Sequence, residues 1–167
     1  MRVARCVRRA KRLTLHKIMS KEPAMQISTR FTIGVHTLLC IAYFDGKART
    51  TSKFIAGSVN ANPVVIRRAL VQLKDAGLIE VAAGTGGASL AKPVSDITLL
   101  DVFDAVESVE DGGLFDFHAN PNPACPVGGS MHKLLDNRLR EAEEALRANL
   151  AQTTLQDLLD ELPAAGE

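Results

Sequence analysis

Tryptophan is absent from the 167-residue chain, and only one tyrosine and six phenylalanines are present. Proteins that bind single-stranded nucleic acid stack its bases on aromatic rings, so this scarcity disfavours that class of binding. Any core must be mainly aliphatic. Because 46% of the residues are hydrophobic, the chain still has enough apolar side chains to fold as a globular domain.

Cysteine is also scarce, and the three in the chain are Cys6, Cys40 and Cys125. An odd number, without the close pair spacing of metal ligands, argues against a disulfide framework and against a structural zinc site. We therefore expect no metal, no cofactor and a reducing, cytoplasmic location.

Long apolar runs are missing as well. The longest, residues 31–44, is interrupted by Thr32, His36 and Thr37, which makes it too short and too polar to cross a bilayer. We expect neither a transmembrane helix nor a membrane partner.

Charges of both signs are present, but they are unevenly distributed. Residues 1–24 hold eight lysines and arginines against one acid, a net charge of +7. Residues 25–92 hold eight against three, or +5, and residues 93–167 hold four against fifteen, or −11. Because like charges repel phosphates, this predicts that the basic part binds a polyanion and that the acidic part stays away from it. Ordinary surface scatter is the alternative explanation.

The segment NANPVVIRRALVQLKDAGLI carries agreeing signals for a helix and for both of its ends. Asn62 is a good N-cap, Pro63 suits the first helical position, and Gly77 lies where a helix ends in a left-handed conformation. An apolar face repeats at helical spacing in Ile66, Ala69, Leu70 and Leu73. The opposite face, which suits the major groove of DNA, carries Val64, Arg67, Arg68 and Val71.

Periodicity predicts the remaining elements. We expect helices at 26–44, 52–59, 98–108, 131–150 and 154–162, strands at 78–81 and 89–91, and a Gly-, Pro- and Asn-rich loop at 110–129. Helix, turn, helix and hairpin in this order define a winged helix-turn-helix. The predicted fold is mainly α with a small β-hairpin, followed by a long C-terminal dimerisation helix.

The predicted helix at 131–150 carries an apolar stripe with spacings of four and three. Pairing with the same helix of a second chain would bury area that neither chain covers alone. Pairs of Arg140 with Glu144 and of Glu143 with Arg147 would support the helix. The predicted dimer interface is Met131, Leu135, Leu139, Ala142, Leu146 and Leu150.

Charge and pattern together predict three parts of the chain. Residues 1–24 form a basic extension without regular structure, which lacks the apolar run of a secretory signal, and we expect the natural start at Met25. Residues 25–92 form a winged helix-turn-helix DNA-binding domain. Residues 93–167 form a linker helix, a loop and a helical dimerisation region.

DNA contacts are predicted at two helix starts, on one helix face and in the hairpin turn. Side chains at helix starts would bind phosphates, and glycines in the turn would let the backbone approach the minor groove. The turn sequence GTGGAS lacks the lysine and Ser/Thr of a nucleotide-binding loop. The predicted DNA-binding residues are Thr51, Ser52, Lys53, Asn62, Val64, Val65, Arg67, Arg68, Thr85, Gly86 and Gly87.

Four blocks resemble the BadM/Rrf-type family of bacterial winged helix-turn-helix regulators, especially its YwnA-like branch. They are FTIGVHTLLCIAYF, TTSKFIAGSVNANPVVIRRALVQLKDAGLIEVAAGTGGASLAKP, DITLLDVFDAVE and TTLQDLLDEL. The resemblance implies a homodimer that binds a palindromic double-stranded DNA operator and represses nearby genes. It implies recognition helices in successive major grooves and wings in the adjacent minor groove.

Cluster-binding members of that family carry three closely spaced cysteines before the dimerisation helix. Only Cys125 lies near that place here, so we expect no iron–sulfur cluster. Cys125 is either a redox-sensing thiol or a structural loop residue.

The sequence leaves two other function classes open. A winged-helix protein-interaction module with an incidental basic face is the first alternative. An enzyme using Asp101 and Asp104 is a more distant one, since a solvated acidic helix face explains these carboxylates more simply. The effector and the operator sequence are not specified by the sequence.

Overall fold

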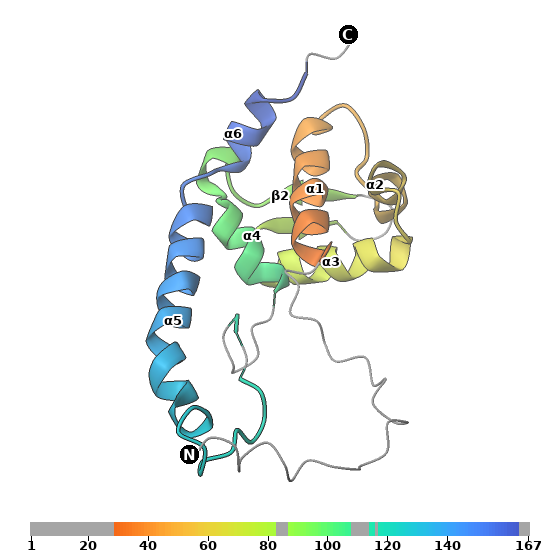
Figure 1. Cartoon of the computed structure of the whole chain (residues 1–167). Coiled ribbons are helices and arrows are strands. Elements are labelled where there is room, and N and C mark those ends of the chain that lie inside the picture. Colours follow the sequence, from red (N-terminus) through yellow and green to blue (C-terminus); the bar gives the residue numbers. More distant parts are fainter. Residues whose placement is uncertain (1–28, 83–86, 108–113, 116, 164–167) are drawn as a thin grey trace.

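The computed structural model describes residues 29–82, 87–107, 114–115 and 117–163. The predicted extension at 1–24 lies outside this part of the chain, as do Thr85 and Gly86. The fold is mainly helical with one antiparallel hairpin, as the sequence predicts (Figure 1). Its elements are α1 (Thr29–Tyr43), α2 (Ser52–Val59), α3 (Pro63–Asp75), β1 (Ile79–Val81), β2 (Ala88–Leu90), η2 (Val94–Asp96), α4 (Leu99–Val106), η3 (Gly128–Ser130), α5 (Met131–Leu150) and α6 (Leu155–Asp160).

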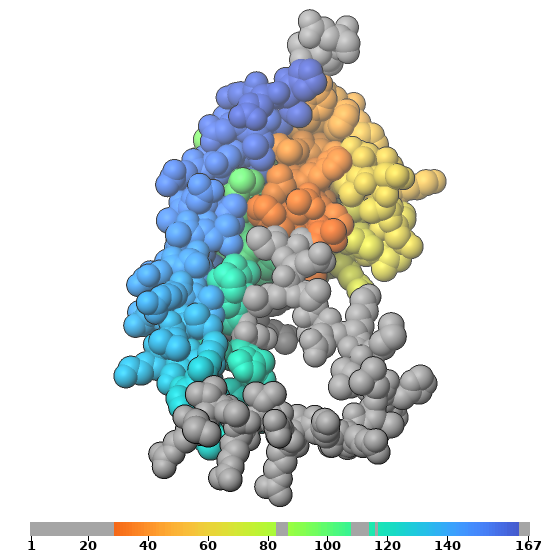
Figure 2. Space-filling view, viewed as in Figure 1, coloured from red at the N-terminus to blue at the C-terminus, as the bar shows by residue number. Residues whose placement is uncertain are grey.

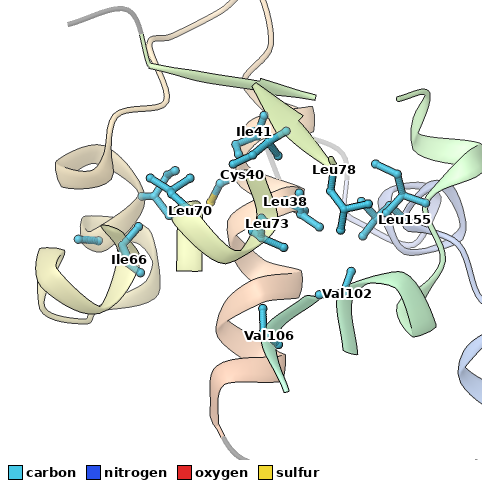
Figure 3. Close-up of a cluster of buried hydrophobic side chains, with 14 residues drawn as sticks. Leu38, Cys40, Ile41, Ile66, Leu70, Leu73, Leu78, Val102, Val106 and Leu155 are labelled. Atoms are coloured by element: carbon cyan, nitrogen blue, oxygen red, sulfur yellow. The ribbon is translucent and has the colours of Figure 1, made fainter. Parts of the chain in front are cut away.

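Helix α1 lies at the centre of the domain and contacts α2, α3, α4, α6 and β2 (Figure 1). The core is aliphatic, and each fully buried Leu, Ile or Val contributes roughly 1.5–3 kcal/mol to folding. Residues beyond position 92 belong to the same core, because α4 and α6 each insert side chains into it. The cluster drawn in Figure 3 includes Leu38, Ile41, Ile66, Leu73, Leu78, Val102, Val106 and Leu155.

The predicted ends of α3 are confirmed. Asn62 caps the helix through its side chain, and Pro63 is the first helical residue. Gly77 has a φ of 70°, and the N–H of Leu78 donates to the carbonyl of Leu73 at 3.0 Å. This bond is part of a Schellman-type helix end, and β1 begins directly after it at Ile79, one residue later than predicted.

Helix α4 is shorter than the predicted 98–108, because Thr98 caps it and it ends at Val106. The N–H of Asp101 donates to the Thr98 hydroxyl at 3.1 Å, and the N–H of Thr98 donates to Oδ2 of Asp101 at 2.8 Å. This reciprocal capping box gives Asp101 a structural role. This capping role adds to the sequence interpretation, which explains Asp101 only as part of a solvated acidic face.

Helix α5 lies along one edge of the molecule and extends past the winged domain (Figure 2). It is held to α4 by Arg147, which donates two hydrogen bonds of 2.8 Å to the carboxylate of Asp104. The predicted pairing of Arg147 with Glu143 is a charge interaction and not a close salt bridge: after the hydrogen bonds to Asp104, the charge of Glu143 helps to raise the pKa of Arg147. Oε2 of Glu143 accepts a bond of 3.2 Å from the N–H of Leu114. The bidentate geometry available at Asp104 is stronger than a single contact within the helix.

Candidate nucleic-acid interface

Helix α3 has one fully inward face and one fully outward face. Ile66, Ala69, Leu70 and Leu73 are buried against the rest of the domain. On the other side, Arg67 and Arg68 are exposed. A rigid helix thus presents two guanidinium groups to solvent, and its burial fixes the direction in which they point.

The side chains that cap α2 and α3 leave hydrogen-bond donors at the start of each helix that could bind a phosphate. The hydroxyl of Thr51 accepts from the N–H of Phe54 at 3.2 Å, and Oδ1 of Asn62 accepts from the N–H of Val64 at 2.9 Å. Capping uses the acceptor capacity of both side chains, whereas binding a phosphate uses the hydroxyl proton and the amide N–H groups. The two roles are chemically compatible, and the partial positive charge at a helix N-terminus favours an anion at the same place.

The hairpin is tied to the start of α2 through Thr50. The Thr50 hydroxyl donates to the carbonyl of Ala88 at 2.6 Å, and the N–H of Ala88 donates to the carbonyl of Thr50 at 3.2 Å. Gly87 has a φ of 86°, and a side chain added there would lie 3.2 Å from the backbone nitrogen of Thr50. Glycine therefore permits both the turn and the close approach that sets the position of the wing.

Two hollows along α3 bring most of the predicted residues together. A hollow of about 380 Å³ between α2, α3 and the hairpin is lined by Thr51, Ser52, Arg67 and Gly87, among others. A second, of about 700 Å³, lies between α3 and α1 and is lined in part by Val64, Val65, Arg67 and Arg68. Arg67 lines both hollows. Lys53 is exposed on α2 next to Ser52.

Two basic residues of this surface were not predicted. Lys74 lines the first hollow and lies seven residues after Arg67, so helical spacing could have identified it. Arg30 lines the second hollow from α1. No local pattern links Arg30 to α3, because the two are adjacent only after the helices have packed.

Cys125 lies away from this surface, in the loop before α5. Hydrogen bonds from the backbone N–H groups of Gly128 and Val127 lower the pKa of its thiol below the ordinary value. The loop is tightly folded there, since a side chain added at Gly128 would lie 2.6 Å from the carbonyl oxygen of Asn122. The loop also touches α5 through the ring of Phe117, which stacks on His132 with centroids 4.1 Å apart.

The chain belongs to the Rrf2 family. The family model, described as an iron-dependent transcriptional regulator, matches residues 27–161. YwnA of Bacillus subtilis, assigned to the HTH-type transcriptional regulators, is 40% identical over 136 residues, which are 81% of this chain and 98% of YwnA. Members of the family are transcriptional regulators and not enzymes, and with its winged helix-turn-helix fold this chain is a DNA-binding transcriptional regulator.

Other relatives and solved structures agree with this assignment. The HTH-type regulator IscR of Cereibacter sphaeroides is 27% identical, and the match covers 81% of this chain and 87% of IscR. The crystal structure of a protein assigned as DNA-binding has a TM-score of 0.64 at 36% identity, over 78% of this chain and 98% of that one. CymR, the global cysteine regulator of B. subtilis, shares the fold with a TM-score of 0.60 at 24% identity, over 83% and 98% of the two chains.

The family description implies iron, but the described residues do not fit an iron centre. Cys40 is buried in the core, and Cys125 lies in the loop before α5. Within the described ranges, no group of three or more His, Cys, Asp or Glu side chains could hold a metal ion. None of the helices described is long and apolar enough to cross a membrane.

Proposed function

We propose that the chain is a sequence-specific repressor that binds double-stranded DNA as a homodimer, with α3 of each copy in the major groove. One observation carries the proposal: Arg67 and Arg68 lie exposed on α3 directly opposite a face that is buried in the core. An Arg guanidinium can donate two hydrogen bonds to a guanine edge, which discriminates against the wrong base by about 1–3 kcal/mol. Thr51, Ser52, Lys53 and Asn62 would hold phosphates on either side.

The homodimer is supported by apolar surface that a single chain leaves uncovered. None of the residues of α5 is buried, although Met131, Leu135, Leu139 and Leu146 form a half-buried stripe along it. A second apolar surface is a hollow of about 600 Å³ along α1, lined by α1, α6 and neighbouring residues, among them Val35, Leu39 and Leu158. Because large apolar patches on soluble proteins mark interaction sites, pairing of two copies is the simplest way to cover both.

A two-fold dimer requires a two-fold operator. We expect a short palindrome with half-sites roughly 34–36 Å apart, one turn of the double helix. The wings, with Thr85, Gly86 and Gly87, would contact the adjacent minor grooves. Such a complex placed over a promoter excludes the polymerase, which accounts for repression, and it acts in the cytoplasm, where the DNA is.

A signal could reach the dimer through the loop at 110–129. The described part of this loop is joined to α5 by the bond from Leu114 to Glu143 and by the stacking of Phe117 on His132. Arg147 in turn joins α5 to Asp104 of the winged domain. A change in the loop would therefore alter how the two recognition helices are spaced.

The test is fluorescence anisotropy with duplexes that tile the region upstream of the gene, in excess random DNA and at two salt concentrations. Arg67→Ala should weaken binding to the operator by about 5- to 150-fold, the equivalent of 1–3 kcal/mol, and affect random DNA far less. Arg140→Ala is the matched control, because this arginine lies exposed on α5 and its removal changes the net charge equally.

Equal and weak binding to every duplex, unchanged by Arg67→Ala, would contradict the proposal. That result would favour a winged domain that binds another protein. Loss of affinity in Arg140→Ala as large as in Arg67→Ala would show a non-specific effect of charge.

A further inference from the structure

Exposed valines lie on the outward face of α3. Val64 is 47% exposed and Val71 is 57% exposed, and the two lie on the same face as Arg67 and Arg68. Valine is a weaker helix former than alanine, lysine or glutamate, so an exposed valine stabilises neither the helix nor the core. The folded chain alone therefore gives no physical reason for this pair.

Their position relative to the arginines restricts what could cover them. At 100° per residue, Val64 and Val71 project within about 20° of one another, at the middle of the outward face. Arg67 and Arg68 project to either side of them. An apolar centre between two cations fits a surface that is anionic at its edges and carries small apolar groups in its floor.

The major groove of DNA has this character. Phosphates form its edges, and the C5-methyl group of thymine is an apolar contact point among the base edges in its floor. Val64 and Val71 are seven residues apart, which is about 10.5 Å along a helix. Base pairs follow one another every 3.4 Å or so, so the two side chains span roughly three base pairs.

We propose that Val64 and Val71 determine specificity by contacting thymine methyl groups roughly three base pairs apart in each half-site, beside the guanine bound by arginine. The inference rests on the proposed function and goes beyond it, because it assigns base identity to two apolar side chains. Val65, 39% exposed, projects about 100° away from Val64 around the helix and is not included.

The experiment replaces each thymine of the operator by uracil, which lacks only the methyl group. Wild-type protein should lose about fourfold in affinity at each contacted thymine, the fold-change for burial of one methyl-sized group. Val64→Ala should bind the unmodified operator more weakly and lose nothing further when its own thymine is replaced. Val71→Ala should behave in the same way at a different thymine.

Two further variants keep the outcome interpretable. Threonine has nearly the shape of valine, so Val71→Thr should bind more weakly than wild type only where thymine is present, because its hydroxyl is a poorer partner for a methyl group. Val127→Ala makes the same truncation at a 65% exposed valine of the loop before α5, and it should lose the same affinity as wild type at every uracil substitution. Alanine favours the helix, so loss of folding is not expected in the α3 variants.

The two levels of the hypothesis fail differently. If the wild type shows no preference for any duplex, the proposed function is wrong. If it binds one operator tightly and uracil has no effect at any position, or the same effect in Val64→Ala and Val71→Ala as in wild type, the methyl contacts are wrong and sequence-specific binding stands.

Discussion

At the scale of single residues, hydrogen bonds from the backbone change the pKa of the Cys125 thiol. The amides of Gly128 and Val127 donate to its sulfur, and the carbonyl of Cys125 accepts from the N–H of Gly129 at 2.9 Å. Donors directed at sulfur stabilise the thiolate over the thiol, so its pKa is lowered. Cys125 is partly exposed, whereas Cys40 is buried in the core.

This difference predicts pH-dependent reactivity. Since the pKa of Cys125 is lowered, its thiolate persists to lower pH than that of an ordinary cysteine, and alkylation by iodoacetamide should reach half of its maximal rate below about pH 8.5. The rate is followed by mass spectrometry in a Cys6→Ser background, with Cys40 as the unreactive internal control. Unfolding in urea should raise the midpoint to the ordinary value. A midpoint in the folded protein at or above that value would contradict the prediction.

At the scale of elements, the wing depends on Gly87. Its φ of 86° lies in the left-handed region, and an added side chain would crowd the backbone of Thr50. Gly87→Ala should therefore destabilise the fold by about 1–2 kcal/mol and weaken DNA binding by shifting the wing. The free energy of unfolding is measured in urea at a fixed protein concentration.

Gly57→Ala is the control, because it should change the free energy of unfolding in the opposite direction. Gly57 is an exposed residue within α2, and an added side chain there meets nothing within 4 Å. This substitution should stabilise the protein by about 0.5–1 kcal/mol. If Gly87→Ala were as stable as wild type, the tie between the hairpin and α2 would not position the wing.

Elements could be predicted from the sequence where their signals are local. Asn62, Pro63 and Gly77 mark the ends of α3 within the helix itself, and the buried face follows from its period. The bond between Thr50 and Ala88 joins residues 38 apart, and that between Arg147 and Asp104 joins residues 43 apart. Such pairs depend on how elements pack, so helical spacing alone did not identify Asp104 as the hydrogen-bonded partner of Arg147.

At the scale of the whole molecule, the helices differ in how much of their apolar surface is buried in the core. The winged domain, α4 and α6 bury one continuous core, while α5 stands outside it and buries none of its residues. A helix of 20 residues is about 30 Å long, and α5 contacts α4, where Arg147 bonds to Asp104, and the loop before it, where Glu143 bonds to Leu114. Its stripe is thus the surface whose burial most depends on a second copy.

Leu146→Glu tests this dependence, because it places a charge within the stripe. Sedimentation velocity should show a dimer for wild type and at least a tenfold higher dissociation constant for the variant, since an unpaired charge resists burial. The fold should survive, because Leu146 is only half-buried and lies outside the core. Ala148→Glu is the control, an equal charge at an exposed position of α5 that faces away from the stripe. Leu146→Glu should reduce the affinity of the protein for the palindromic operator more than its affinity for a single half-site. An unchanged dissociation constant of the dimer would mean that the two copies meet elsewhere.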